Sequence, residues 1–400
     1  MHRVRRHPPA WFVLAVAALI VVVTGCSSSE PPRGAPRSCI TNFDATTDYF
    51  PDKVSPHDAD NFRIAYHRSY AVLTVPQPYP GGKPQSYVLV RCGAPKPTLD
   101  TSLTNAPYIN VPVSSLYAGS TTQIPPLVEL GGLDALTGVA DGSLISNQQV
   151  RQRVEDRRVA VYSRGGTINT EAVLAAKPDV VLTEGVDAPA YAKIADAGIG
   201  VVAGADWLES TPLGRAEWIK VIALLTGHEA TANQVYDGIA QRYRQIADTV
   251  RSASAVPVLS GTMYQGTWSV PAGGSHFGTL LKDAGARWPW QDSTGTGSLQ
   301  LGFETVYTRA GQIPLWLVID NRWTTTADVV ATDPRYGTLA AVQSGQVWNA
   351  NKAMGPGGGN DYLERGASRP DLVLQDLVAI VHPELVNDHR FVFYRPLTRS

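Results

Sequence analysis

Short apolar runs alternate with amphipathic segments from residue 107 onward. The runs at 178–184 and 198–204 read as buried strands on either side of a predicted helix at 189–197. The same alternation returns after residue 254. Continuous apolar strands between helices are typical of parallel sheets that are covered on both faces. The pattern therefore predicts an α/β fold with mainly parallel sheets, in which YINVPVSSL (108–116) forms an early strand.

Residues 210–253 interrupt this alternation. Apolar residues recur there at three- and four-residue steps, which predicts a long amphipathic helix over 231–251, preceded by a helix that ends at Gly227. At 1.5 Å per residue the long helix measures ~30 Å, enough to connect two domains. We therefore expect two αβ lobes joined by one long helix. The predicted bounds are 107–209 for the N-terminal lobe, 210–253 for the helical connector and 254–390 for the C-terminal lobe.

A β-rich extension precedes the first lobe, over residues 39–106. Its runs YAVLTV (70–75) and SYVLVRC (86–92) flank a turn rich in proline and glycine, which predicts a β-hairpin. The extension holds Cys39 and Cys92, for which a disulfide is the expected state in an oxidising compartment. The alternative, a metal-binding or catalytic thiol, lacks a nearby Cys/His spacing.

The N-terminus carries the longest apolar run of the chain. Arg3, Arg5 and Arg6 precede the run Trp11–Val23, as in a secretory signal peptide. The sequence Val-Thr-Gly-Cys that follows resembles a bacterial lipobox, which implies cleavage before Cys26 and acylation of that cysteine. The alternative is an uncleaved signal anchor, but the run is short for a membrane span of ~20 residues. We expect a signal peptide over 1–25 and a flexible Ser/Pro/Gly-rich spacer over 26–38, with the protein tethered to the outer face of the cytoplasmic membrane.

Charge and known motifs exclude several classes of function. The chain has 34 Lys and Arg against 35 Asp and Glu. It therefore lacks the excess of basic residues that a nucleic-acid-binding protein would need. There is no G-x-S-x-G, H-E-x-x-H or P-loop motif, and the glycine-rich GPGGGND (355–361) reads as a flexible loop. We expect neither an enzyme nor a cofactor. Sites for bare metal ions need converging ligands, whereas the histidines are scattered, at His57, His67, His228, His276, His382 and His389.

Five stretches in order resemble the extracytoplasmic binding proteins of iron-siderophore and cobalamin ABC importers. The resemblance covers roughly 107–386 and implies two αβ lobes joined by a single long helix. It rests on NTEAVLAAKPDVVL (169–182), LGRAEWIKVIALLTGHEATA (213–232), LLKDAGARWPWQDSTGTGSLQLGFETVY (280–307), LAAVQSGQVW (339–348) and SRPDLVLQDLVAIVHPEL (368–385).

The same resemblance implies partners for the protein. Members of this family use one exposed glutamate on each lobe to dock arginines of the permease, and the matching positions here are Glu171 and Glu304. Two carboxylates at a fixed separation would give an oriented, bivalent dock. The alternative is that each carboxylate only stabilises the first turn of its own helix. We expect a monomer that works with an ABC permease and its ATPase.

In open αβ sheets, ligands bind beyond the carboxyl ends of the strands. The predicted loops at these ends are rich in aromatic and arginine side chains, which can bury flat ligand surface and pair with anionic chelate oxygens. The candidate ligand-binding residues are Tyr117, Arg164, Trp207, Tyr264, Trp268, His276, Arg322, Trp323 and Tyr362.

Together these features predict a lipid-anchored receptor that delivers a ferric siderophore or a similar metal chelate to an ABC permease. Cobalamin or haem is the alternative ligand. The alternative from another class is a surface interaction protein that keeps this fold without a permease.

Overall fold

A computed structural model describes residues 39–399. The predicted signal peptide (1–25), the predicted spacer (26–38) and the predicted acylation site Cys26 lie outside the described residues. Within the described range, no helix is both long enough and apolar enough to span a membrane.

A four-stranded sheet opens the described chain. The strands pair in the order β1-β2-β3-β4, antiparallel except for β3 and β4, which run parallel. The hairpin of β2 and β3 confirms the predicted one, and its connecting loop includes Gly81 at a φ of 76°. The strands are β1 (Arg63–Tyr66), β2 (Tyr70–Val75), β3 (Gln85–Arg91) and β4 (Tyr108–Val111).

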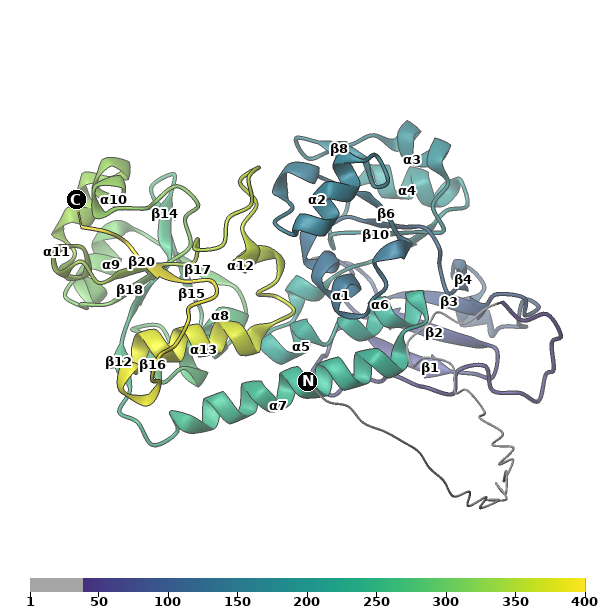
Figure 1. The fold of residues 1–400 in the computed structure, drawn as a ribbon, viewed down its shortest axis with the longest axis horizontal. Coiled ribbons are helices and arrows are strands. Elements are labelled where there is room, and N and C mark those ends of the chain that lie inside the picture. The colour runs from purple at the N-terminus through teal and green to yellow at the C-terminus, as the bar shows by residue number, and fades with distance from the viewer. Residues whose placement is uncertain (1–38, 400) are drawn as a thin grey trace, which may run out of the picture. The chain divides into compact units, whose positions relative to one another are not determined.

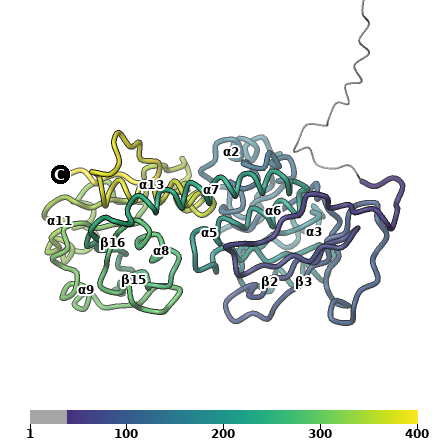
Figure 2. The backbone as a smooth tube through the Cα atoms, turned by 90° about the horizontal axis from the view of Figure 1, so that it is seen from below, coloured from purple at the N-terminus to yellow at the C-terminus, as the bar shows by residue number. Residues whose placement is uncertain are grey.

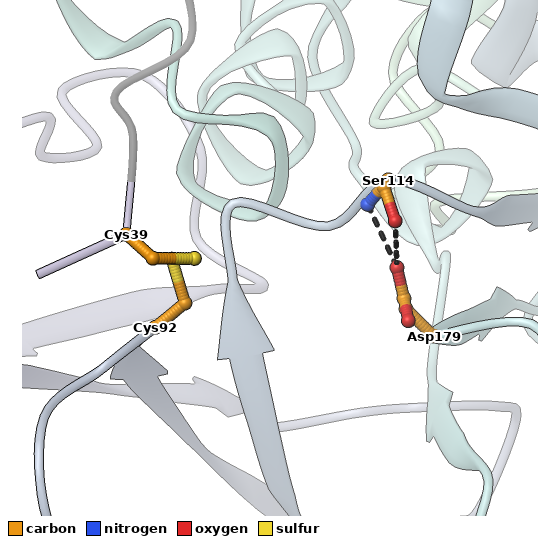
Figure 3. The surroundings of a disulfide bond; sticks show 4 residues. All are labelled: Cys39, Cys92, Ser114 and Asp179. Atoms are coloured by element: carbon orange, nitrogen blue, oxygen red, sulfur yellow. Dashed lines mark hydrogen bonds between the residues drawn. A yellow bond between two sulfur atoms is a disulfide. The ribbon is translucent and has the colours of Figure 1, made fainter. Parts of the chain in front are cut away.

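Cys39 and Cys92 form the expected disulfide (Figure 3). Cys92 directly follows β3, so the bond fastens the start of the described chain to the N-terminal sheet. The cysteines are 53 positions apart. Closing a loop of this length in the unfolded chain contributes about 4 kcal/mol of stability in the chain-entropy model.

The N-terminal lobe contains a five-stranded parallel sheet in the order β11-β10-β5-β6-β7. All three residues of the interior strand β10 are buried, as the apolar pattern predicted. The strands are β5 (Leu116–Ala118), β6 (Leu136–Val139), β7 (Ala160–Val161), β10 (Val180–Leu182) and β11 (Gly200–Val202), with a small hairpin of β8 (Ser163–Arg164) and β9 (Thr167–Ile168). The helices are α1 (Ile124–Glu129), α2 (Gln148–Glu155), α3 (Thr170–Ala176) and α4 (Pro189–Asp196).

The single strand predicted over 108–116 is instead two strands in two different sheets. β4 belongs to the N-terminal sheet and β5 to the lobe, and a cis peptide bond joins Val111 to Pro112 between them. The Asp179 carboxylate then fixes the entry to β5, because it accepts a hydrogen bond from the backbone N–H of Ser114 at 2.7 Å (Figure 3). It also accepts from the backbone N–H of Ser115 at 2.9 Å. The apolar pattern continues through this change of sheet, so it could not reveal it.

Three helices follow the N-terminal lobe: α5 (Pro212–Ala216), α6 (Ile219–Thr226) and α7 (Glu229–Thr249). Gly227 ends α6 in the left-handed conformation, as predicted. α7 has 21 residues, about 30 Å in length, and begins and ends two residues before the predicted bounds. It packs on α6 at one end and on α13 (Pro370–Val381) of the second lobe at the other, so it bridges the lobes (Figures 1 and 2).

The C-terminal lobe is built on a four-stranded sheet in the order β13-β18-β19-β20, parallel except for the last pair. A parallel pair and a three-stranded antiparallel sheet complete it. The strands are β12 (Val256–Pro257), β13 (Leu259–Ser260), β14 (Thr262–Tyr264), β15 (Thr267–Pro271), β16 (Ala286–Arg287), β17 (Ser298–Leu301), β18 (Trp316–Val318), β19 (Val347–Asn349) and β20 (Arg395–Pro396). Its other helices are α8 (His276–Asp283), α9 (Phe303–Ala310), α10 (Thr326–Thr332), α11 (Ala340–Ser344) and α12 (Asp361–Glu364).

Short 3-10 helices occur in the connecting segments. Two of them, η2 and η5, follow strands β5 and β11 of the N-terminal lobe and help to position the candidate site. The 3-10 helices are η1 (Thr101–Leu103), η2 (Thr121–Gln123), η3 (Leu133–Ala135), η4 (Gly142–Leu144), η5 (Asp206–Leu208), η6 (Pro334–Thr338) and η7 (Pro383–Leu385).

Two buried carboxylates, at the ends of η5 and α5, hold the N-terminal extension in place. Glu217, at the end of α5, accepts hydrogen bonds from the backbone N–H groups of residues 57–59 and from Lys220 Nζ at 2.6 Å. Glu209 accepts from the N–H groups of residues 60 and 61 and from Trp218 Nε1. The extension is therefore fixed by long-range polar contacts that the local sequence pattern does not indicate.

Candidate functional site

The loops at the carboxyl ends of strands from both lobes meet. In the N-terminal lobe η2 follows β5, and in the C-terminal lobe α12 follows β19; these two helices are in contact. The loop after β6 also reaches the C-terminal lobe, because the N–H of Ser146 donates to Glu364 at 2.6 Å. We call the space between these loops the interlobe cleft. A pocket of about 290 Å³ in it is lined by Ser146, Asn147, Ala353, Met354, Gly355, Asp361 and Arg365.

Four of the nine candidate ligand-binding residues are exposed. On the N-terminal lobe, Arg164 lies at the tip of the β8–β9 hairpin, and the indole of Trp207 is 42% exposed while its Nε1 donates to Glu184 O. On the C-terminal lobe, Tyr264 is 74% exposed in the β14–β15 hairpin, and Arg322 follows β18.

The two candidate arginines differ in their pairing. Arg322 Nη2 lies 2.9 Å from Asp320 Oδ2, and the same carboxylate accepts from the backbone N–H of residue 322. Arg164 forms no ion pair with any residue of the described chain. An anionic ligand would therefore have to compete with Asp320 for Arg322 but would meet an unpaired guanidinium at Arg164.

Four other candidates lie inside their lobes. Trp268 is 0% exposed and donates to Ser260 O, and Trp323 is also buried and donates to Thr332 Oγ1. Tyr117 stacks on Tyr162, and Tyr362 packs edge-on against Phe393 and Tyr394. These rings present almost no surface to a ligand, because they fill the cores beneath the loops where the sequence places them.

His276 begins α8, and the preceding Ser275 caps that helix by accepting from the N–H of Gly278. Its Nε2 is buried and has no hydrogen-bond partner among residues 39–399. Burial, with a smaller contribution from the Arg215 guanidinium, lowers the pKa of His276 to about 3. The imidazole is therefore neutral at physiological pH and does not supply a cation for an anionic ligand.

The low pKa of His276 predicts a specific dependence of stability on pH. Unfolded histidine titrates near ~6.5, so between ~6.5 and about 3 the unfolded chain binds a proton that the folded chain does not. The contribution of neutral His276 to the free energy of unfolding is therefore complete above pH ~6.5. Below that pH it falls by about 1.4 kcal/mol per pH unit. We expect His276→Gln to reduce the slope of unfolding free energy against pH between pH ~5 and ~6.5, by the amount that corresponds to about one proton. Urea unfolding across this range measures the slope.

The matched control for that experiment is His57→Gln, at an exposed histidine of the N-terminal extension. It controls for the loss of an imidazole elsewhere in the chain. If His276→Gln keeps the slope of the unmodified protein, His276 takes up a proton as readily in the folded state as in the unfolded state, and our account of its burial is wrong.

Sequence reasoning missed an ion pair beneath the cleft. Arg215 Nε lies 3.0 Å from Asp206 Oδ2, and both side chains are mostly buried. Thr122 Oγ1 also donates to this carboxylate at 3.3 Å. Residues 367–368 of the C-terminal lobe line the same small cavity, so the pair lies where the lobes meet. No local signal could have found it, because only the fold brings the two side chains together across nine positions of the chain.

The candidate docking residues occupy equivalent places in the two lobes. Glu171 lies in the first turn of α3 and Glu304 in the first turn of α9, and both are exposed. Neither carboxylate forms an ion pair or a hydrogen bond with any described side chain. Both are therefore free to receive a partner's cations, although each also suits the positive end of its own helix.

Comparison with known proteins assigns the family. The model of the periplasmic binding protein family matches residues 116–353, more than half of the chain. An uncharacterized lipoprotein of Methanocaldococcus jannaschii is 24% identical over 302 residues, which cover 72% of this chain and 70% of the relative. No group of three His, Cys, Asp or Glu side chains placed to hold a metal ion occurs within residues 39–399.

Solved structures share the fold. A periplasmic heme binding protein from Pseudomonas aeruginosa aligns with a TM-score of 0.54 at 20% identity, over 72% of this chain and 99% of the other. CeuE of Helicobacter pylori with Ni(II) bound aligns with a TM-score of 0.53 at 17% identity, over 69% of this chain and 86% of the other. The α/β architecture, with two lobes bridged by α7, is thus the one expected from the sequence, and the chain belongs to the periplasmic binding protein family, a family of binding proteins and not of enzymes.

Proposed function

We propose that this protein is the substrate-binding component of an ABC importer, which captures a ferric siderophore in the interlobe cleft and delivers it to a membrane permease. The observation that carries the proposal is the meeting of two αβ lobes at the carboxyl ends of their parallel strands. Family membership supports it. The lipobox-like sequence before Cys26 supports a lipid anchor, as does the relative that is named a lipoprotein.

The chemistry of the exposed loop residues suits a metal chelate. Arg164 and Arg322 can pair with anionic chelate oxygens, while Trp207 and Tyr264 can cover flat organic surface. A chelated metal brings its own donor atoms, so such a ligand requires no protein ligands to the metal. Haem is the second candidate, because a structural relative is named as a heme binding protein and the same arginines could pair with propionates.

A ligand panel tests the proposal. The protein would carry Cys26→Ser, which removes the acylation site, and be titrated with ferric hydroxamates, ferric catecholates, ferric citrate, haem and cobalamin. We expect a ferric siderophore to quench tryptophan fluorescence and to raise the melting temperature. Trp207 is the exposed reporter on the N-terminal lobe, so Trp207→Phe should reduce the quenching but keep the thermal shift.

The two arginines supply the control within the panel. Loss of a hydrogen bond to a charged group costs about 1.5–3 kcal/mol, so Arg164→Gln should weaken binding of an anionic chelate by about 10- to 100-fold. Arg322→Gln should have a smaller effect, since Asp320 already pairs with that guanidinium. Binding of haem alone would favour the second candidate. The absence of quenching and of a thermal shift with every compound would contradict the receptor function.

A further inference from the structure

The glycine-rich loop after β19 is not free. Sequence reasoning treats residues 355–361 as a flexible loop, but the N–H of Gly355 donates to Gly359 O at 2.7 Å and Met354 pairs with Asn360. The loop is thus a tight hairpin at the start of α12. It lies beyond residue 353, where the match to the family model ends.

Three glycines of this hairpin touch the backbone of the N-terminal lobe. A Cβ atom would lie 3.0 Å from Ile145 O at Gly355, 2.3 Å from Ser143 O at Gly357 and 2.1 Å from Leu144 O at Gly359. None of these three glycines has a positive φ, so close approach and not backbone conformation requires glycine there. The alternating positions 355, 357 and 359 therefore place one face of the hairpin against residues 143–145.

Glu364 fastens the same contact from the end of α12. Its carboxylate is buried, with the residue 1% exposed, and accepts hydrogen bonds from the N–H groups of Ser146 at 2.6 Å and Asn147 at 3.0 Å. Ser146 Oγ also donates to Asp361 Oδ1 at 3.2 Å. Charge-assisted hydrogen bonds are about twice as strong as neutral ones.

The N-terminal side of the contact is itself supported by α2. Asn147 caps this helix by accepting from the N–H of Val150 at 3.1 Å. Arg151, one turn later, donates to the carbonyl oxygens of residues 145 and 146. The segment that receives the hairpin and Glu364 is therefore held to the first turn of α2 by side-chain hydrogen bonds.

We propose that residues 355–364 and 143–147 form an interlobe latch that fixes the separation of the two lobes along one side of the cleft. Resting on the proposed function, the latch positions the ligand-binding surface of one lobe against that of the other, and Gly355, Gly357, Gly359 and Glu364 are its positioning residues.

Pulsed electron paramagnetic resonance tests the latch without any ligand. Spin labels at Glu155→Cys on α2 and Arg309→Cys on α9 report the distance between lobes, in the chain with Cys26→Ser; both positions are exposed and Cys39 and Cys92 are paired. We expect one narrow distance distribution in this labelled parent. Gly357→Ala places a methyl group against Ser143 O. This variant should shift the distance distribution to longer distances and broaden it.

Gly297→Ala is the matched control, since a Cβ there meets nothing within 4 Å. It should leave the distribution unchanged. Glu364→Gln, which loses the charge but nearly keeps the shape, should broaden the distribution to a smaller degree and decides the question if Gly357→Ala does not fold. A distribution that stays narrow and unshifted in the folded latch variants would overturn the proposal.

Ligand binding separates this proposal from the proposed function. In the panel above, Gly357→Ala should weaken the ferric siderophore that the parent binds by about tenfold, while Gly297→Ala should not change its affinity. If the parent binds none of the compounds, the proposed function fails, and the distance measurement still decides whether the latch exists. If the distance distribution changes but siderophore affinity does not, the lobes are latched without positioning the ligand, and that part of the proposal is wrong.

Discussion

Replacing Glu217 by glutamine is expected to lower the free energy of unfolding by about 3–5 kcal/mol, the cost of breaking a buried ion pair from one side. Glu217 is 0% exposed and Lys220 is 1% exposed, and their charged atoms are 2.6 Å apart. The glutamine amide would bring a hydrogen-bond donor into a site whose neighbours, three backbone N–H groups and the ammonium, are also donors. Residues 57–59 would lose part of their attachment to Glu217, because only one side-chain oxygen remains to accept their hydrogen bonds, and Lys220 would lose its counter-ion.

Urea unfolding followed by tryptophan fluorescence measures this loss. Glu155→Gln, at an exposed carboxylate of α2, is the matched control and should change the unfolding free energy by less than about 0.5 kcal/mol. Lys220→Met combined with Glu217→Gln should recover part of the loss, because the unpaired buried cation is then gone. Lys220 also donates to Ser55 O at 2.8 Å and lies over the ring of Tyr236, so recovery should be incomplete.

Hydrogen exchange gives a second, local readout of the same variant. In the unmodified protein the N–H groups of residues 57–59 donate to a buried carboxylate, which should protect them strongly from exchange. We expect this protection to fall in Glu217→Gln more than protection in β10 falls. Equal unfolding midpoints for Glu217→Gln and Glu155→Gln would show that the pair contributes no net stability.

These contacts also explain which parts of the fold the sequence could reveal. Helix periodicity and continuous apolar strands are local patterns, and they located α7, β10 and β11 within a few residues. The sequence around Glu209 and Glu217 gives no sign that their carboxylates are buried and hydrogen-bonded. Their partners in the N-terminal extension lie 148–160 residues away in the chain. The change of sheet at Pro112 could not be predicted either, because the residues on both sides of this proline are apolar and fit one continuous strand.

At the candidate site, the sequence could not show which side chains are exposed and which are buried. Sequence placed aromatic residues near strand ends, but it could not distinguish Trp207, which is exposed, from Trp268, which fills the core beside Trp316 and Tyr336. Trp207 follows β11 and Trp268 lies at the start of β15, and only the packing of segments distant in sequence shows which of the two is buried. The interlobe latch is a further example, since Ser146 and Glu364 are 218 residues apart.

The second large effect is expected in transport. If Glu171 and Glu304 dock the protein on its permease, Glu171→Gln combined with Glu304→Gln should reduce uptake of the ferric ligand at least tenfold while its affinity for the soluble receptor stays the same. Each charge-assisted pair with a permease arginine contributes about 1.5–3 kcal/mol, and two pairs at a fixed spacing act together. Either single variant should therefore lose less uptake than the double variant.

The alternative role of these carboxylates predicts a different pattern. If each one only favours the first turn of its own helix, its loss costs about 0.3–1 kcal/mol of stability and leaves uptake unchanged. Uptake by cells that express the importer, together with the melting temperature and ligand affinity of the purified receptor, separates the two roles, and Glu155→Gln controls for the loss of an exposed charge. Full uptake by the double variant would show that the permease binds a different surface of the protein. A receptor that binds its ligand but supports no uptake in the unmodified form would instead favour the surface interaction protein, because delivery into the cell requires a permease.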